Sequence, residues 1–167
     1  MPAAPTSFRV RGRKEDRLKL DSVDKILEFA IGKEQEAADF YKDLADKMAR
    51  PSMKDVFLGF SKEEMGHKAK LEGVKKGKKL VVPEKQVADL KIGDYLADQE
   101  VTHDMDYQQA LIVAMKAEKA AFVLYNSLAD ITKDAVLKSL FLALAQEEAR
   151  HKLRFEIEYD EVILSEN

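Results

Sequence analysis

Apolar and small side chains recur every three or four residues along four segments of this chain. The first segment runs from about Ser22 to Ala49, and the second begins behind Ser52. The third follows Asp104, and the fourth follows Thr132. This spacing places the apolar side chains on one face of an α-helix. The pattern therefore predicts four long amphipathic helices, of which the first three are capped by Ser22, Ser52 and Asp104.

Two kinds of connection join the predicted helices. The loops inside the first and the second pair are only a few residues long, so we expect the helices of each pair to be antiparallel neighbours. The connection between the pairs contains Pro83 and Gly93 and has no strong helical period. The predicted parts are a basic N-terminal tail at 1–21, a four-helix bundle at 22–160 with hairpins at 22–77 and 106–160, a crossover at 78–105, and a C-terminal tail at 161–167.

The two predicted hairpins repeat one sequence pattern. An offset of 84 positions aligns them without a gap. The aligned polar and aromatic residues are Glu34 with Glu118, Tyr41 with Tyr125, Glu64 with Glu148, and His67 with His151. The chain is therefore interpreted as two copies of one helical hairpin, which predicts a pseudo-twofold bundle whose equivalent residues meet at its middle.

Composition narrows the classes of function. The sequence has 28 Lys and Arg against 31 Asp and Glu, and this net charge of −3 argues against a nucleic-acid partner. It has no Cys, which excludes disulfides, thiolate catalysis and iron–sulfur centres. No apolar run approaches the roughly 18 residues of a membrane span, and the N-terminal segment has no apolar signal core. We therefore expect a cytoplasmic protein with no membrane partner.

Charged residues interrupt the apolar stripe of each predicted helix. Four glutamates and two histidines lie in register with it: Glu34, Glu64, His67, Glu118, Glu148 and His151. Buried carboxylates repel one another and lose their hydration, and no Lys or Arg is expected on the stripe to compensate them. Two divalent metal ions balance four carboxylate charges, and Glu and His three residues apart share one helix face. The pattern predicts a dinuclear metal site whose ligands suit iron, manganese or zinc.

Several nearby polar residues keep more than one interpretation. Tyr41 and Tyr125 either hydrogen-bond a ligand carboxylate, relay an electron, or pack in the core with the hydroxyl bonded to a core Glu. Glu63 and Glu147 point about 100° away from the stripe, which favours ion pairs on the outer face or a hydrogen bond to a ligand over metal ligation. His103 lies in the connection, away from a Glu at ligand spacing, and is expected to be a surface residue.

Four segments of this sequence resemble the ligand-bearing helices of the ferritin-like superfamily, and most of all those of rubrerythrin-type domains. They are AIGKEQEAADFYKDLADK, FSKEEMGHKAKLE, AMKAEKAAFVLYNSLAD and LAQEEARHKLRFE, and the resemblance covers about 22–160. It implies an all-α, ferritin-like four-helix bundle with a long crossover between helices two and three. It also implies that the six residues above bind two iron ions, with Glu64 and Glu148 as bridges.

The chain differs from rubrerythrins in three respects. It has no Cys for a rubredoxin-like iron, so the resemblance implies an external electron donor. Ala121 stands where rubrerythrins have an extra carboxylate. The fourth-helix motif, Glu148-x-x-His151, is more similar to the symmetric ligand set of bacterioferritin. These differences affect the reaction that the resemblance implies more than they affect metal binding.

Three functional interpretations follow. The first is a di-iron oxidoreductase, a peroxidase or ferroxidase that reacts Fe(II) with hydrogen peroxide or dioxygen in oxidative-stress defence or iron handling. The second is a non-catalytic helical scaffold that holds Zn, Mn or Fe for storage, delivery or sensing, and the third is a silent bundle whose Arg-rich tail docks on a partner. We also expect a homodimer, because several apolar residues lie off the stripe: Phe29, Phe40, Ile112, Phe122 and Leu140.

Overall fold

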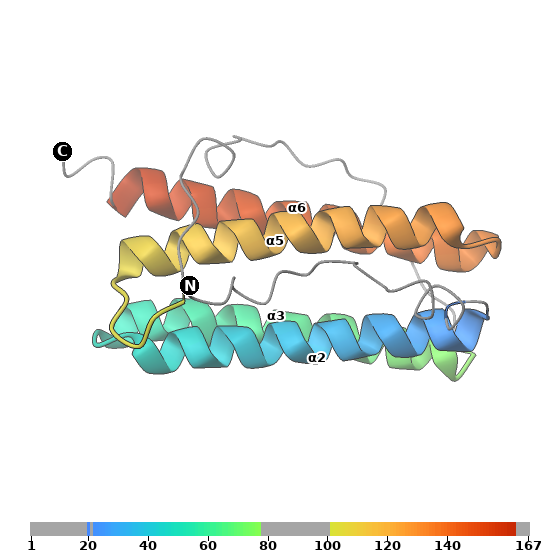
Figure 1. The fold of residues 1–167 in the computed structure, drawn as a ribbon, viewed down its shortest axis with the longest axis horizontal. Helices are drawn as coiled ribbons and strands as arrows, with labels where there is room; N and C mark the ends of the chain where they lie inside the picture. The colour runs from blue at the N-terminus through green and yellow to red at the C-terminus, as the bar shows by residue number, and fades with distance from the viewer. Residues whose placement is uncertain (1–19, 21, 78–100, 163–167) are drawn as a thin grey trace, which may run out of the picture. The chain divides into compact units, whose positions relative to one another are not determined.

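The computed structural model describes residues 20, 22–77 and 101–162 (Figure 1). These residues form four long helices, and no strand occurs among them. The helices are α2 (Val23–Lys47), α3 (Pro51–Lys75), α5 (Tyr107–Ile131) and α6 (Ala135–Val162). The all-helical prediction is confirmed for this part of the chain. The predicted N-terminal tail, most of the crossover and most of the C-terminal tail lie outside the described residues.

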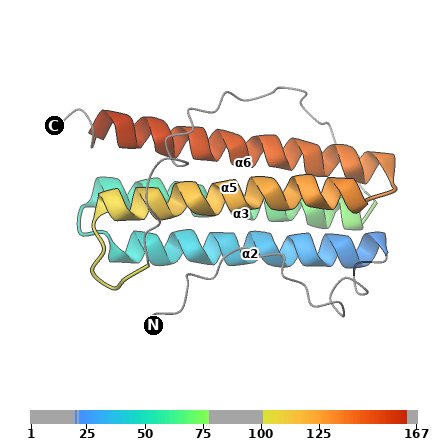
Figure 2. The same ribbon diagram turned by 45° about the horizontal axis from the view of Figure 1, so that its top comes forward.

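The first hairpin consists of α2 and α3, which lie side by side and antiparallel in both views (Figures 1 and 2). Ser22 caps α2 as predicted, because its Oγ accepts a hydrogen bond from the Lys25 amide at 3.2 Å. Pro51 is the first residue of α3, so the predicted Ser52 cap is wrong. A residue before proline avoids the helical conformation, and Arg50 is accordingly extended at φ −88° and ψ 131°. The effect of Pro51 on Arg50 therefore fixes where the turn between α2 and α3 ends and where α3 begins.

A glycine in the left-handed conformation follows the C-terminus of α3. Gly77 has a φ of +83°, and its amide donates a hydrogen bond to the Val74 carbonyl at 2.9 Å. A residue without a Cβ adopts this conformation at little steric cost, which is why glycine commonly follows a helix C-terminus. The helix itself ends at Lys75, two residues before this glycine.

The second hairpin begins at caps that differ from the expected ones. Asp106, and not Asp104, caps α5: its Oδ1 accepts from the Gln109 amide at 2.8 Å, while the Gln109 side chain accepts from the Asp106 amide at 2.9 Å. This reciprocal pair is a capping box. Asp134 caps α6 by accepting from the Leu137 amide at 2.8 Å, two residues beyond Thr132. Both helices of this hairpin therefore start two residues later than expected.

Apolar residues of α2 and α3 form the core of the first hairpin. The fully buried ones include Leu27, Ala30, Tyr41, Leu44, Ala45, Phe57 and Leu71. The Ser61 hydroxyl donates to the Ala38 carbonyl at 2.8 Å, so the two helices approach each other through small residues at this level. The core positions follow the three-and-four spacing of the sequence.

The second hairpin repeats the aromatic packing of the first. Tyr41 stacks on Phe57 with ring centroids 6.5 Å apart, and Tyr125 stacks on Phe141 at 6.0 Å. Each pair is related to the other by the offset of 84 positions. The internal repeat predicted from the sequence is therefore present in the packing of each hairpin.

A polar clamp holds the start of α5 to the end of α6. The Tyr107 hydroxyl donates to Glu158 at 2.7 Å, and the Gln108 amide group donates to the Tyr159 hydroxyl at 3.1 Å. Burial and the neighbouring Glu158 raise the pKa of Tyr107, so this phenol keeps its proton and remains the donor. The clamp fixes how the two helices align along their length.

Two of the apolar residues on which the homodimer prediction rested have another explanation. Ile112 and Leu140 are buried within the chain itself, at 4% and 2% exposed. They therefore contribute to the core and give no indication of a second copy. Among the described residues, none of the helices has the length and apolar character needed to cross a bilayer.

Candidate metal-binding site

The α2/α3 hairpin contains a triad of metal-ligating residue types, Glu34, Glu64 and His67. Glu34 comes from α2, while Glu64 and His67 lie one turn apart on α3. The Nδ1 atom of His67 is 3.6 Å from Glu34 Oε1 and 3.4 Å from Glu64 Oε2. All three side chains are buried. The local fold thus brings together three of the six residues predicted as ligands.

The second hairpin contains the equivalent triad, Glu118, Glu148 and His151. Glu118 comes from α5, and α6 supplies Glu148 and His151. The Nδ1 atom of His151 is 3.3 Å from Glu118 Oε1 and 3.8 Å from Glu148 Oε2. These three side chains are buried as well. The repeat therefore reproduces both the residue types and their geometry.

The chemistry of each triad fits a divalent metal ion. Within each triad, every residue offers a ligand atom, and these atoms lie within 4.8 Å of one another. Carboxylate oxygen and imidazole nitrogen are ligands of iron, manganese and zinc. Two carboxylates with a neutral imidazole carry a charge of −2, which one divalent ion neutralises. The buried carboxylate and histidine groups are thus able to hold metal ions.

Burial changes the protonation of Glu34. Removal from water, together with the hydrogen bond with Glu64, raises the pKa of Glu34 from 4.5 to about 8, although His67 acts in the opposite direction. A charged carboxylate beside a second carboxylate in an apolar core is unfavourable, so the proton stays on. In the metal-free protein, Glu34 is therefore mostly protonated at neutral pH. A metal ion that uses this carboxylate has to displace a proton.

The structure contradicts one expectation about the surroundings of the ligands. Lys152, which follows His151 on α6, is only 4% exposed, and it pairs with the fully buried Glu156 at 3.2 Å. A cation therefore does share the buried face of α6, contrary to the sequence prediction. The spacing of four residues from Glu148 to Lys152 and from Lys152 to Glu156 was the available signal, because such residues lie on one helix face.

The surface position predicted for His103 and the outer-face ion pair predicted for Glu147 are both confirmed. His103 is exposed, as is Glu63. Glu147 accepts a hydrogen bond from Arg150 at 2.9 Å, which is an ion pair on the outer part of α6. Tyr41 and Tyr125 are buried among aromatic rings in their own hairpins.

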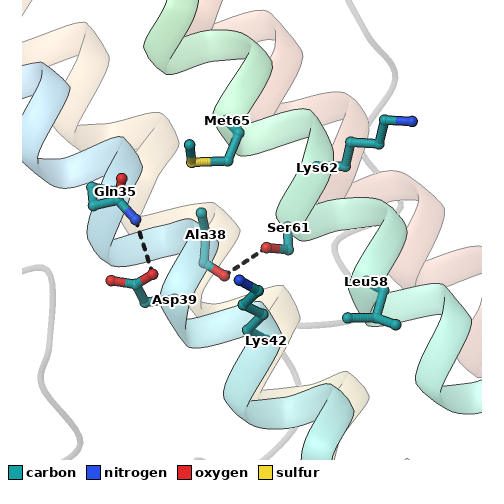
Figure 3. A pocket seen from close by; sticks show the side chains of 8 residues that line it. All are labelled: Gln35, Ala38, Asp39, Lys42, Leu58, Ser61, Lys62 and Met65. Atoms are coloured by element: carbon teal, nitrogen blue, oxygen red, sulfur yellow. Dashed lines mark hydrogen bonds between the residues drawn. The ribbon is translucent and has the colours of Figure 1, made fainter.

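A groove of about 290 Å³ lies on the α2/α3 hairpin (Figure 3). Its floor contains Ala38 and the Ser61 hydroxyl bonded to the Ala38 carbonyl. Gln35 donates to Asp39 along one side at 2.9 Å, and the side chains of Leu58 and Met65 stand on the α3 side (Figure 3). The lining includes none of the six predicted ligands, so this groove is distinct from the candidate metal site.

Comparison with known proteins supports the resemblance seen in the sequence. The family model described as "Ferritin-like domain" matches residues 22–156, a range that contains all six predicted ligands. No curated protein matches the chain.

Two solved structures share its fold. One is an uncharacterized conserved protein from Magnetospirillum magnetotacticum MS-1, with 22% identity, a TM-score of 0.64, and coverage of 84% of this chain and 95% of that one. The other is a hypothetical protein from Pyrococcus furiosus, with 26% identity, a TM-score of 0.58, and coverage of 87% and 92%.

Proposed function

The chain belongs to the ferritin-like domain family, and from this premise we propose that its two Glu-Glu-His triads hold two divalent metal ions, iron above all. The proposed activity is that of a di-iron oxidoreductase of rubrerythrin or ferritin type, which reacts Fe(II) with hydrogen peroxide or dioxygen. Ferritin-like di-iron proteins take one Glu from each of two helices and Glu-x-x-His from each of the other two. The six residues of this chain match that set.

The repeated burial of the triad carries the proposal. Each hairpin buries two carboxylates beside one imidazole at equivalent positions. Burying a carboxylate without a compensating charge costs several kcal/mol, so two buried carboxylates in each hairpin are unfavourable for folding alone. A divalent ion at each triad removes this penalty. Because this cost occurs in both hairpins, it favours metal binding over a purely structural role for the six residues.

Each side chain has a proposed role at the site. Glu34 and Glu118 each bind a metal from the helix that faces the Glu-x-x-His motif, and His67 and His151 act as terminal nitrogen ligands. The resemblance assigns the bridging role to Glu64 and Glu148, and we retain this assignment as part of the proposal. When bound, two iron ions supply electron transfer to the oxidant. The buried setting of the six residues keeps bulk water away from them.

The reductant is proposed to lie outside the residues described here. Returning two ferric ions to the ferrous state requires two electrons, and these 167 residues contain no Cys for a rubredoxin-like iron. Ala121 replaces the extra carboxylate of rubrerythrins and is only partly buried. These differences favour a symmetric site that resembles bacterioferritin in its ligands. The homodimer and the cytoplasmic location remain predictions.

Anaerobic titration of the metal-free protein with Fe(II), followed by dioxygen or hydrogen peroxide, tests the proposal. We expect a break near two irons per chain and a fast change in near-ultraviolet absorbance after the oxidant is added. His67→Ala and His151→Ala should each lower the stoichiometry or weaken binding. His103→Ala is the matched control, because His103 is the exposed third histidine, and it should leave both unchanged.

The outcomes separate the competing functions. A preference for one of the two oxidants distinguishes a peroxidase from a ferroxidase. Two bound metals without any oxidant-dependent change would support the structural or storage scaffold in place of the enzyme. Failure to bind metal, or equal loss in His103→Ala, would contradict the assignment of the site itself.

A further inference from the structure

Met65 is a methionine whose side chain is open to solvent. It lies on α3 between the predicted ligand Glu64 and Gly66, and 41% of its surface is exposed. The space beside position 66 is open as well, since a Cβ on Gly66 would meet no atom within 4 Å. Water and small solutes therefore reach the Met65 thioether.

The other methionines in the described part of the chain are less accessible. Met48, Met105 and Met115 are buried, at 5%, 3% and 0% exposed, and Met53 is half-buried. An oxidant has to reach the sulfur atom before it can react with it. The difference in exposure therefore predicts a difference in the rate at which the methionines are oxidised.

Met65 also forms part of the wall of the groove on the α2/α3 hairpin. Its side chain extends from α3 toward the α2 side, where Gln35 stands (Figure 3). The groove has a volume of about 290 Å³. A water molecule occupies about 30 Å³ in the liquid, so a molecule as small as hydrogen peroxide has room in the groove.

Two lysines make the same groove suitable for a polar oxidation product. Lys42 lines the groove from α2, and Lys62 lines it from α3, one helix turn before Met65. Each ammonium group has three N–H donors, and the oxygen of a methionine sulfoxide is an acceptor. Oxidation of Met65 therefore places the new oxygen where solvent and hydrogen-bond donors are already present.

Oxidation of a buried methionine has a different consequence. Met115 is fully buried on α5, so a sulfoxide at that position would place a polar oxygen in the apolar core. Met65 is outside the core of its hairpin, and its oxidation leaves the buried apolar contacts intact. The second hairpin has Ala149 at the position equivalent to Met65, so the repeat carries a thioether at this position in the first hairpin alone.

We propose that Met65 is a site of reversible oxidation, at which hydrogen peroxide forms methionine sulfoxide before it reacts with the buried methionines. A sulfur lone pair attacks one peroxide oxygen, so an S–O bond forms and the O–O bond breaks. The departing hydroxide takes the proton of the transferred oxygen and leaves as water, and the sulfur is oxidised by two electrons. Methionine sulfoxide reductases reverse the change. In that step two thiols become a disulfide, the S–O bond breaks and water leaves.

Peptide mass spectrometry after peroxide treatment tests the selectivity. The full-length protein is first freed of metal with a chelator, so that no iron generates radicals, and is then treated with hydrogen peroxide for increasing times. We expect Met65 to gain one oxygen about tenfold faster than Met48, Met105 and Met115, with half-buried Met53 between them. The same protein in guanidinium exposes every methionine, and the order of rates should disappear.

Two leucine substitutions identify the residue that reacts first. Met65→Leu keeps an apolar side chain of similar size and should remove the fast phase of oxygen uptake. Met53→Leu, on the same helix, is the matched control and should leave the fast phase unchanged. Protein oxidised at Met65 should have the same midpoint of urea denaturation as the untreated protein, and treatment with methionine sulfoxide reductases should restore its original mass.

Every outcome supports or overturns the proposal. Equal rates at Met65 and at the buried methionines, or the same order of rates in guanidinium, would overturn selective oxidation by the folded protein. A lower denaturation midpoint after oxidation of Met65, or a sulfoxide that the reductases leave in place, would overturn reversibility. The measurements use metal-free protein and need no bound ion. Failure of the proposed metal site therefore leaves this inference standing, and failure of this inference leaves the metal site standing.

Discussion

Glu34 illustrates how one buried carboxylate couples stability to metal binding. Its pKa lies near 8 because burial disfavours the charged form and Glu64 adds a second negative group. The proton is therefore part of the metal-free core, and a metal ion is its substitute. Protonated Glu34 is the favourable form in the metal-free protein, whereas the charged form of Glu34 is the one that binds a metal ion.

The pH dependence of the metal-free protein follows from this shift. The pKa of Glu34 is higher in the folded state than in the unfolded state, so its contribution to stability is fully present below about pH 4.5 and is lost as the pH rises through about 8. We expect the free energy of unfolding to fall over this window by at most about 1.4 kcal/mol per pH unit from this group.

Chemical denaturation of metal-free protein from pH 5 to 9 measures this slope. Glu34→Gln keeps the shape of the side chain and removes its titration, so it should flatten the slope. Glu36→Gln is the control, because Glu36 is exposed on the same helix, and its slope should match that of the unmodified protein. Equal slopes in Glu34→Gln and the unmodified protein would contradict the assignment.

At the scale of the helices, the sequence predicted where the four helices lie more accurately than it predicted the residue at which each helix begins. Periodicity found all four helices because burial enforces it along their whole length. The N-cap residues were harder to predict, because Ser, Thr and Asp occur at several positions before each helix and all three residue types are good N-caps. Asp106 prevails over Asp104 because Gln109 stands three residues after it and completes a capping box. Pro51 similarly overrides Ser52, because proline fits the first turn.

The capping box makes a direct prediction for α5. Asp106→Ala removes the acceptor of the Gln109 amide and should lower the free energy of unfolding by about 0.5–2 kcal/mol. Asp104→Ala alters the residue that the sequence favoured and should have little effect, since Asp104 is exposed before the helix. Urea denaturation of the two variants compares them, and an equal loss in both would refute the role of Asp106.

For the whole molecule, the internal repeat is what made the candidate site predictable. Glu-x-x-His alone is a weak signal, but its recurrence at one offset with a Glu on each partner helix singled out six residues. The structure brings each set of three together within its hairpin. The repeat also concealed a difference, because identical residue types at 68 and 152 differ in burial. That difference depends on tertiary packing, which a comparison of ligand positions alone does not detect.

Metal binding should therefore stabilise the molecule as a whole. A ligand that binds only the folded state adds about 2.7 kcal/mol per site at a free concentration of one hundred times its dissociation constant. We expect Zn(II) or Mn(II) to raise the melting temperature of the metal-free protein, and a chelator to reverse the rise.

Variants of the two hairpins show whether both triads contribute to this stabilisation. His67→Ala and His151→Ala should each lose a large part of it, because each removes the nitrogen ligand of one triad. His103→Ala should retain all of it. If metal leaves the melting temperature unchanged, or if only one of the two triad variants loses stabilisation, the repeat has preserved residue types without preserving two metal positions. Full loss in either variant would instead show that the two positions bind metal as one cooperative unit.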